Sequence, residues 1–222
     1  MRNGSRTRRS TPRRRSSPLQ RHIGGRSRRA GGQALVEFAL VIPLFLVLFA
    51  GIIEFGFLFN ATLASSFGTR DASLIAAEAG DVAGGDCVIL QKIEQDMGAP
   101  ADPGSIQNVQ IYWANETTGV PIGGAVNTYT RTGSTTCDVQ GTSVTVPYTI
   151  SGTPGYIADD RCNILAGCGT DSVGRNHPGV DTIGVSLNYQ YSWHTPLKSL
   201  LGWTGGGLNF TRSNAMRMEP VL

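Results

Sequence analysis

Residues 34–59 form a long apolar stretch, and they read ALVEFALVIPLFLVLFAGIIEFGFLF. The stretch from Phe38 to Ile53 carries no charge, and its apolar character continues to Phe59. As an α-helix, Phe38–Phe59 is long enough to cross a hydrocarbon core of roughly 30 Å. The core helix of a soluble protein is rarely apolar on every face. The sequence therefore predicts a transmembrane helix.

The charges are distributed unequally on the two sides of this span. Residues 1–32 contain eleven Arg and no Asp or Glu, whereas the chain from Ala61 onward has eight Lys or Arg against fourteen Asp or Glu. An Arg-rich arm can bind nucleic acid. Positive charge beside an apolar span more often keeps that side in the cytoplasm. We therefore expect a single-pass protein of the cell membrane with a cytoplasmic N-terminus, an extracytoplasmic C-terminal domain and no nucleic-acid partner.

A cleavable secretory signal is the main rival to a permanent anchor. Its apolar core is normally about 7–15 residues long and is followed by small residues at the cleavage point. The apolar run here is longer, and Thr62-Leu63-Ala64 is a poor match to such a point. These features favour an anchor that is not cleaved in this way.

All four cysteines follow the apolar span. An even number of cysteines in an exported domain indicates disulfides. Four free thiols in a cytosolic protein are the less favoured alternative. Of the three pairings that four cysteines allow, we favour Cys162–Cys168, which is local within a loop, and Cys87–Cys137, which would tie a helix to the sheet region.

The pattern of the remaining chain predicts an α+β fold. Helical spacing of apolar residues continues from Ala61 to Ala79, and a second helix is expected from Asp86 to Met97, with Asp86 as N-cap and Gly98 as C-cap. Alternating residues then indicate strands at residues 109–113, 144–150, 183–193 and 208–218, with Pro147 arguing for an edge position.

Three regions follow from these elements. Residues 1–32 have little to bury and are expected to be a disordered tail or leader. Residues 33–80 form a long transmembrane helix that continues as a stalk. Residues 81–222 form an extracytoplasmic domain in which a short helix packs on a small, pilin-like antiparallel sheet.

No pattern in the sequence indicates an enzyme. The three histidines, His22, His177 and His194, have no motif that places a nucleophile beside them, and the common phosphate-binding, hydrolase and zinc-protease motifs do not occur. A metal site could be imagined from loop residues, but their spacing matches no known ligand loop; these residues are Asp159, Asp160, Asp171 and His177. We expect no catalytic site, metal or cofactor, and an anchored hydrolase is a remote alternative.

The start of the span resembles a known processing motif. Gly32-Gln-Ala-Leu-Val-Glu37-Phe38 resembles the prepilin-peptidase motif of Flp-type pilins. The resemblance implies cleavage after Gly32, Gln33 as the new N-terminus, Glu37 at the fifth mature position and Phe38 as the aromatic residue that follows. The free amine of one subunit could then pair with the Glu37 carboxylate of its neighbour, because burying two charges as a pair costs less than burying either alone.

A longer stretch is similar to the TadE/TadG-like family of the tight-adherence system. After the Glu37-Phe38 pair, this signature has Pro43 and then the end Gly51-Ile-Ile-Glu54-Phe-Gly56. The family resemblance implies a TadE-like pseudopilin or accessory protein in Flp pilus assembly. Its expected partners are the membrane, other pilus or pseudopilin subunits, secretion machinery and a prepilin peptidase. The alternative is a TadG-like anchored envelope protein that binds cell-wall or secretion partners.

The span also contains residues suited to helix assembly. Gly51 and Gly56 are small positions through which like helices can pack. The second acid, Glu54, lies near the outer end, where it is expected to reach the headgroup layer or to be protonated. The Arg-rich segment of 32 residues is long for a leader, so the sequence leaves open whether it is removed or kept as a permanent tail.

Overall fold

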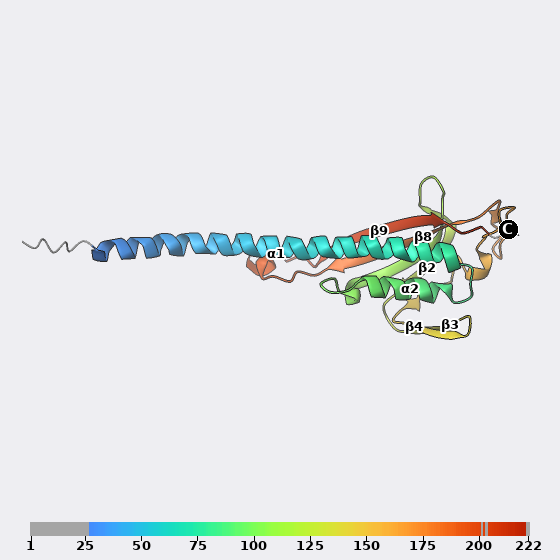
Figure 1. Ribbon diagram of the computed structural model, residues 1–222, viewed down its shortest axis with the longest axis horizontal. Helices are drawn as coiled ribbons and strands as arrows, with labels where there is room; N and C mark the ends of the chain where they lie inside the picture. The colour runs from blue at the N-terminus through green and yellow to red at the C-terminus, as the bar shows by residue number, and fades with distance from the viewer. Residues whose placement is uncertain (1–26, 201, 203, 221–222) are drawn as a thin grey trace, which may run out of the picture. The chain divides into compact units, whose positions relative to one another are not determined.

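The computed structural model describes residues 27–200, 202 and 204–220. The chain divides between Phe45 and Leu46 into two compact units, each of which is described by itself. The first is represented by the beginning of helix α1 (Ser27–Ala79). The second contains the rest of that helix, the strands and the other helices (Figure 1).

Helix α1 contains the predicted span. Among the described residues it is the one helix long and apolar enough to cross a membrane, over Gly32–Ala79, which suggests a single-pass membrane anchor. Pro43 lies inside the helix. Most of the expected disordered segment, residues 1–26, lies outside the described residues, and the helix begins at Ser27 instead of Gln33.

A five-stranded antiparallel sheet forms the centre of the second unit. Its strand order is β5-β2-β1-β8-β9, and every neighbouring pair is antiparallel. The strands are β1 (Ile106–Ala114), β2 (Pro121–Thr130), β5 (Thr149–Ile150), β8 (Thr182–Tyr191) and β9 (Leu208–Arg217).

The alternation that predicted β8 places its large side chains on one face. All five are buried, namely Ile183, Val185, Leu187, Tyr189 and Tyr191. On the other face, the ring of Tyr112 from β1 crosses directly over Gly184, where a Cβ atom would collide with it. The sheet therefore requires glycine at this position.

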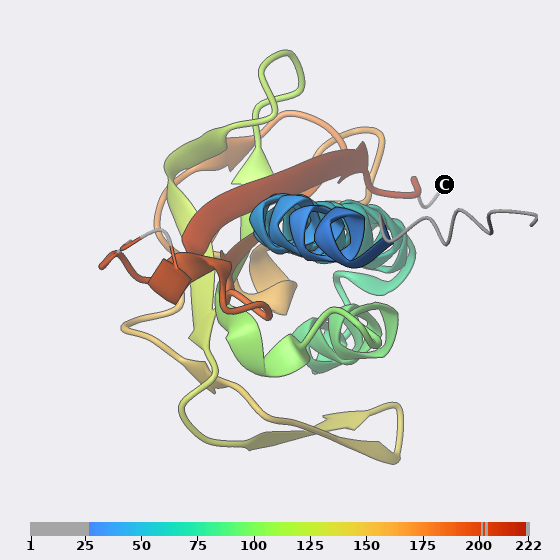
Figure 2. The ribbon, with the colours of Figure 1, turned by 90° about the vertical axis from the view of Figure 1, so that its left-hand side faces the viewer.

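Two helices cover the apolar face of the sheet. Ala72 and Ala76 on α1 are fully buried, as are Leu90 and Ile93 on α2 (Gly85–Asp96). These residues belong to the same hydrophobic cluster as the inward side chains of the sheet. Figure 2 shows both helices on the same side of the sheet. The architecture is therefore α+β, as the sequence predicted, with a long apolar helix, a short helix and antiparallel strands.

Smaller elements and two disulfides complete the second unit. The elements are the hairpins β3 (Thr135–Val139)–β4 (Thr142–Val146) and β6 (Gly169–Thr170)–β7 (Asn176–His177), helix α3 (Leu197–Leu200), and the 3₁₀ turns η1 (Pro103–Ser105) and η2 (Ala158–Asp160). The disulfides join Cys87 to Cys137 and Cys162 to Cys168. These are the two pairs that the sequence analysis favoured.

Three local expectations were wrong. Helix α2 is capped by Gly84, whose φ of 80° suits glycine, and ends with Met97 as its C-cap, so Asp86 and Gly98 are not the caps. Strand β8 ends at Tyr191, two residues before the predicted end, because the chain turns there toward α1. Pro147 lies between β4 and β5 and not within one strand.

Candidate functional site

The residues of the predicted processing motif, Gly32 to Phe38, lie on about two turns of α1. The Gln33 side-chain amide donates to Glu37 Oε1 at 3.0 Å. Phe38 is 62% exposed, and a Cβ atom at Gly32 would have no neighbour within 4 Å. The structure therefore presents the motif residues on an accessible helix surface, and their roles in processing remain predictions.

The second acid of the span is held by the outer domain. Glu54 is 4% exposed. Its carboxylate accepts hydrogen bonds from the backbone N–H of His194 at 3.0 Å and of Thr195 at 2.7 Å, and from the hydroxyl of Tyr191. Glu54 thus fixes the segment after β8 onto α1, a role that the sequence did not reveal.

An apolar pocket of about 340 Å³ adjoins this carboxylate. Its walls come from α1 and from the chain after β8, and include Gly51, Phe55, Leu58 and Leu197. Gly51 and Gly56 have no neighbour within 4 Å of where a Cβ atom would lie. The small positions predicted for helix packing are therefore open in this single chain.

A buried polar cluster ties the end of α1 to the rest of the outer domain. The side chain of Arg161 is fully buried and lies 2.6 Å from Asp86 Oδ1. Arg161 also donates to the Gly80 carbonyl at the end of α1 and to the Tyr156 carbonyl at 3.0 Å. On β2, Asn127 and Tyr129 donate to the other oxygen of Asp86, at 2.9 and 2.6 Å. Burial and the neighbouring Asp86 charge raise the pKa of Tyr129. No local sequence pattern predicts this cluster, because its members lie far apart along the chain.

His177 lies between two carboxylates in the loop region. Its Nδ1 is 2.7 Å from Asp181 Oδ1, its Nε2 is 3.3 Å from Asp171 Oδ2, and its ring stacks on Trp113 at 4.0 Å. Burial raises the pKa of Asp171, but hydrogen bonds from Arg175 and His177 outweigh this and lower it to about 2. These charged and aromatic side chains form a structural cluster around His177.

The other acids of the imagined metal site do not belong to this cluster around His177. Asp160 instead accepts hydrogen bonds from the backbone and hydroxyl of Ser172, at 2.9 and 2.6 Å. Asp159 is exposed. Over the described ranges, no group of three or more His, Cys, Asp or Glu side chains is arranged to hold a metal ion.

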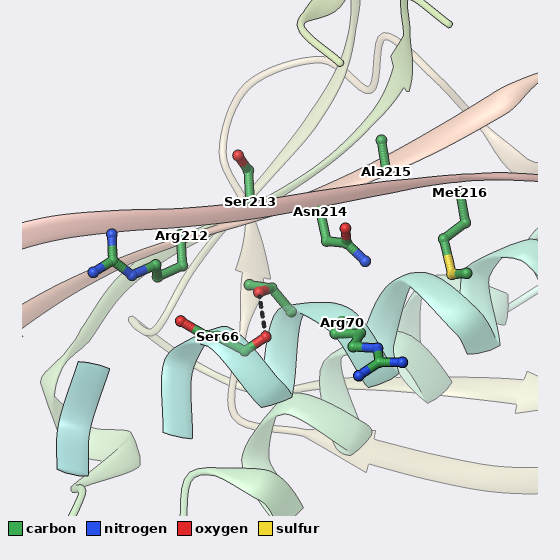
Figure 3. A pocket seen from close by; sticks show the side chains of 8 residues that line it. Ser66, Arg70, Arg212, Ser213, Asn214, Ala215 and Met216 are labelled. Carbon is green, nitrogen blue, oxygen red and sulfur yellow. Dashed lines mark hydrogen bonds between the residues drawn. The ribbon is translucent and has the colours of Figure 1, made fainter. Parts of the chain in front are cut away.

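A polar groove runs between α1 and the outer strand β9. Its volume is about 350 Å³, and it is lined by Ser66, Thr69 and Arg70 of α1 and by residues 212–216 of β9 (Figure 3). One hydrogen bond spans the two elements next to it, from the Asn214 side chain to Ser73 Oγ at 2.7 Å. Nothing in the sequence pattern indicated this groove.

Comparison with known proteins finds a family match for one segment of the chain. Residues 32–73 match the model of the family described as TadE-like protein, and the match begins at Gly32 of the predicted processing motif and covers the apolar span. No curated protein and no solved structure matches the chain. The part of α1 that carries the motif and the span is therefore similar to the TadE-like family.

Proposed function

We propose that this chain is a membrane-anchored TadE-like pseudopilin or accessory protein that takes part in assembling Flp pili. The observation that carries the proposal is the family match over residues 32–73. The matched segment holds both acids of the span, Glu37 and Glu54, and the small residues Gly51 and Gly56. Its role is structural rather than catalytic: it presents a helix to other subunits of the assembly.

The hydrogen-bond partners of the two acids on α1 support different roles for them. Glu54 is already bonded to the outer domain through Tyr191, His194 and Thr195. Glu37 bonds only to Gln33, one turn earlier, in the part of the chain that the structure describes. Glu37 is therefore the acid available to a partner, and the N-terminal amine of a neighbouring subunit is the cation that it would meet.

Sequencing of the mature N-terminus tests the processing step. We expect protein purified from membranes of the native host to begin at Gln33, after removal of residues 1–32 by a prepilin peptidase. A mature protein that begins at Met1 would contradict this step. The chain would then be a TadG-like anchored envelope protein, with the Arg-rich segment as a permanent cytoplasmic tail and the outer domain binding cell-wall or secretion partners.

A substitution at Glu37 tests the assembly role. Glu37→Ala removes the carboxylate from an otherwise apolar helix, so the protein should still enter the membrane while surface pili become scarce. Glu116→Ala, at an exposed acid of the loop between β1 and β2, is the matched control and should leave piliation unchanged. Normal piliation with Glu37→Ala would count against the proposed register role.

A further inference from the structure

Strand β9 offers a regular, uncovered hydrogen-bonding edge beside the groove. It is the last strand in the sheet order, and its ten residues pair with β8 without a register shift. It contains no Pro and no bulge, two of the features that protect an edge strand, and its charged residues are Arg212 and Arg217. The opposite edge is the two-residue strand β5. Of the two edges, β9 is therefore the one able to accept another strand.

The pairing of β9 with β8 shows which backbone groups are free. The Met218 N–H donates to the Asp181 carbonyl at 2.8 Å, and opposite residues of an antiparallel pair alternate between bonded and non-bonded. Asn214 and Met216 therefore exchange hydrogen bonds with β8, whereas the backbone N–H and C=O of Ser213 and Ala215 point away from it. Both of these residues line the groove.

Two arginines without acidic partners border the same groove. Elsewhere in the outer domain, Arg131 bonds to Glu94, Arg161 to Asp86 and Arg175 to Asp171. Arg70 and Arg212 have no carboxylate within ion-pair distance in the described ranges of the chain. Figure 3 shows Arg70 on the helix side and Arg212 on the strand side. The groove therefore combines free strand hydrogen bonds with uncompensated positive charge.

We propose that this groove binds an extended, carboxylate-bearing segment of a neighbouring protein, which adds to the sheet as a strand beside β9. The backbone of the segment would bond to Ser213 and Ala215, and its acidic side chains would reach Arg70 and Arg212. Strand addition takes its affinity from main-chain hydrogen bonds and its specificity from side-chain contacts. Charge-assisted hydrogen bonds to arginine supply the preference for carboxylates.

The charges and the position of the groove disfavour two other occupants. Two copies of β9 are a poor match, because the strand has Arg212 and Arg217 and no acid. Lipid headgroups are also disfavoured. Ser66 and Arg70 follow the predicted end of the span at Phe59 by seven and eleven residues, which places them about 10–16 Å beyond the hydrocarbon core at the helical rise per residue. A headgroup layer is only about 5–7 Å deep.

Peptide binding to the full-length protein in detergent micelles tests the proposal. The probe is an extended peptide of alternating Thr and Val with two Glu, and its control has Gln at the two Glu positions. NMR of the ¹⁵N-labelled protein should show that the acidic peptide shifts the amide signals of Ser213 and Ala215. The Gln peptide should bind about tenfold more weakly, because each carboxylate loses a charge-assisted hydrogen bond.

Variants separate the groove from general charge attraction. Arg70→Ala and Arg212→Ala should each weaken binding about five- to tenfold. Arg217→Ala is the matched control, because it removes the same charge from the same strand at an exposed position outside the groove. Ala215→Pro removes a backbone N–H that β8 does not use, so it should block binding while the circular dichroism spectrum stays native.

Several results would overturn the proposal. Equal affinity for the Glu and Gln peptides would show that the arginines do not recognise carboxylates. A loss of affinity with Arg217→Ala equal to that with Arg70→Ala or Arg212→Ala would indicate unspecific charge attraction. Shifts at Ser213 and Ala215 with vesicles of anionic lipid, but none with the peptide, would assign the groove to lipid. The groove lies outside the predicted processing motif and span, so this experiment and N-terminal sequencing can fail independently.

Discussion

At the scale of single residues, the two acids of the apolar helix differ in what surrounds them. Glu54 is buried against the segment after β8, where two backbone N–H groups and the Tyr191 hydroxyl point at its carboxylate. Glu37 is exposed and bonds to Gln33. One acid therefore holds the protein's own domain on α1, and the other is exposed on the helix surface. The sequence analysis assigned Glu37 to the processing motif and expected Glu54 to reach the headgroup layer or to be protonated, and it did not predict that Glu54 holds the segment after β8.

A change at Glu54 should loosen the segment that it holds. Glu54→Gln keeps the shape but replaces one acceptor oxygen by an N–H₂ group, which faces the N–H of His194 if it takes the place of Oε1 and the N–H of Thr195 if it takes the place of Oε2. Leaving such buried donors without an acceptor costs about 1–3 kcal/mol. We expect amide hydrogen exchange at His194 and Thr195 to accelerate by about tenfold or more, with little change in the distant hairpin β3–β4. Unchanged exchange at both amides would show that the carboxylate does not hold this segment.

At the scale of elements, the sequence predicted the strands in which apolar and polar side chains alternate. It missed a strand whose regular pattern is interrupted by glycine. Strand β8 was predicted because its apolar residues recur at every second position. Strand β2 was missed because it contains Gly123 and Gly124, both with positive φ, and much of it is exposed. The Asp86–Arg161 pair and the groove beside β9 join residues from separate elements, so no local pattern could reveal them.

The two disulfides should stabilise the domain by different amounts. Cys87–Cys137 closes a loop with a sequence separation of 50 and joins α2 to β3, whereas Cys162–Cys168 has a separation of 6. The chain-entropy relation gives about 4 kcal/mol for the longer loop and about 2 kcal/mol for the shorter one. Denaturant unfolding of the two double Cys→Ala variants should therefore show the larger loss for Cys87→Ala/Cys137→Ala. Equal losses would mean that closing the longer loop adds nothing.

At the scale of the whole molecule, the composition of the chain and its disulfides agree on one topology. The eleven arginines precede the span, and all four cysteines follow it and are paired. Arginine near a span opposes translocation, and disulfides persist in oxidising compartments outside the cytoplasm. Each observation independently predicts that the α+β domain lies outside the cell membrane and that residues 1–32 begin in the cytoplasm.

Charge in the N-terminal segment should therefore control the orientation of the protein. Thr117→Cys adds a thiol in the exposed loop between β1 and β2, and a membrane-impermeant maleimide should label it in intact spheroplasts. Replacing the eleven arginines by Gln removes the retention signal, so a substantial fraction of chains should invert and become labelled only after permeabilisation. Replacing them by Lys preserves the charge and should preserve the labelling. Full labelling of the Gln variant would show that the arginines do not set the topology.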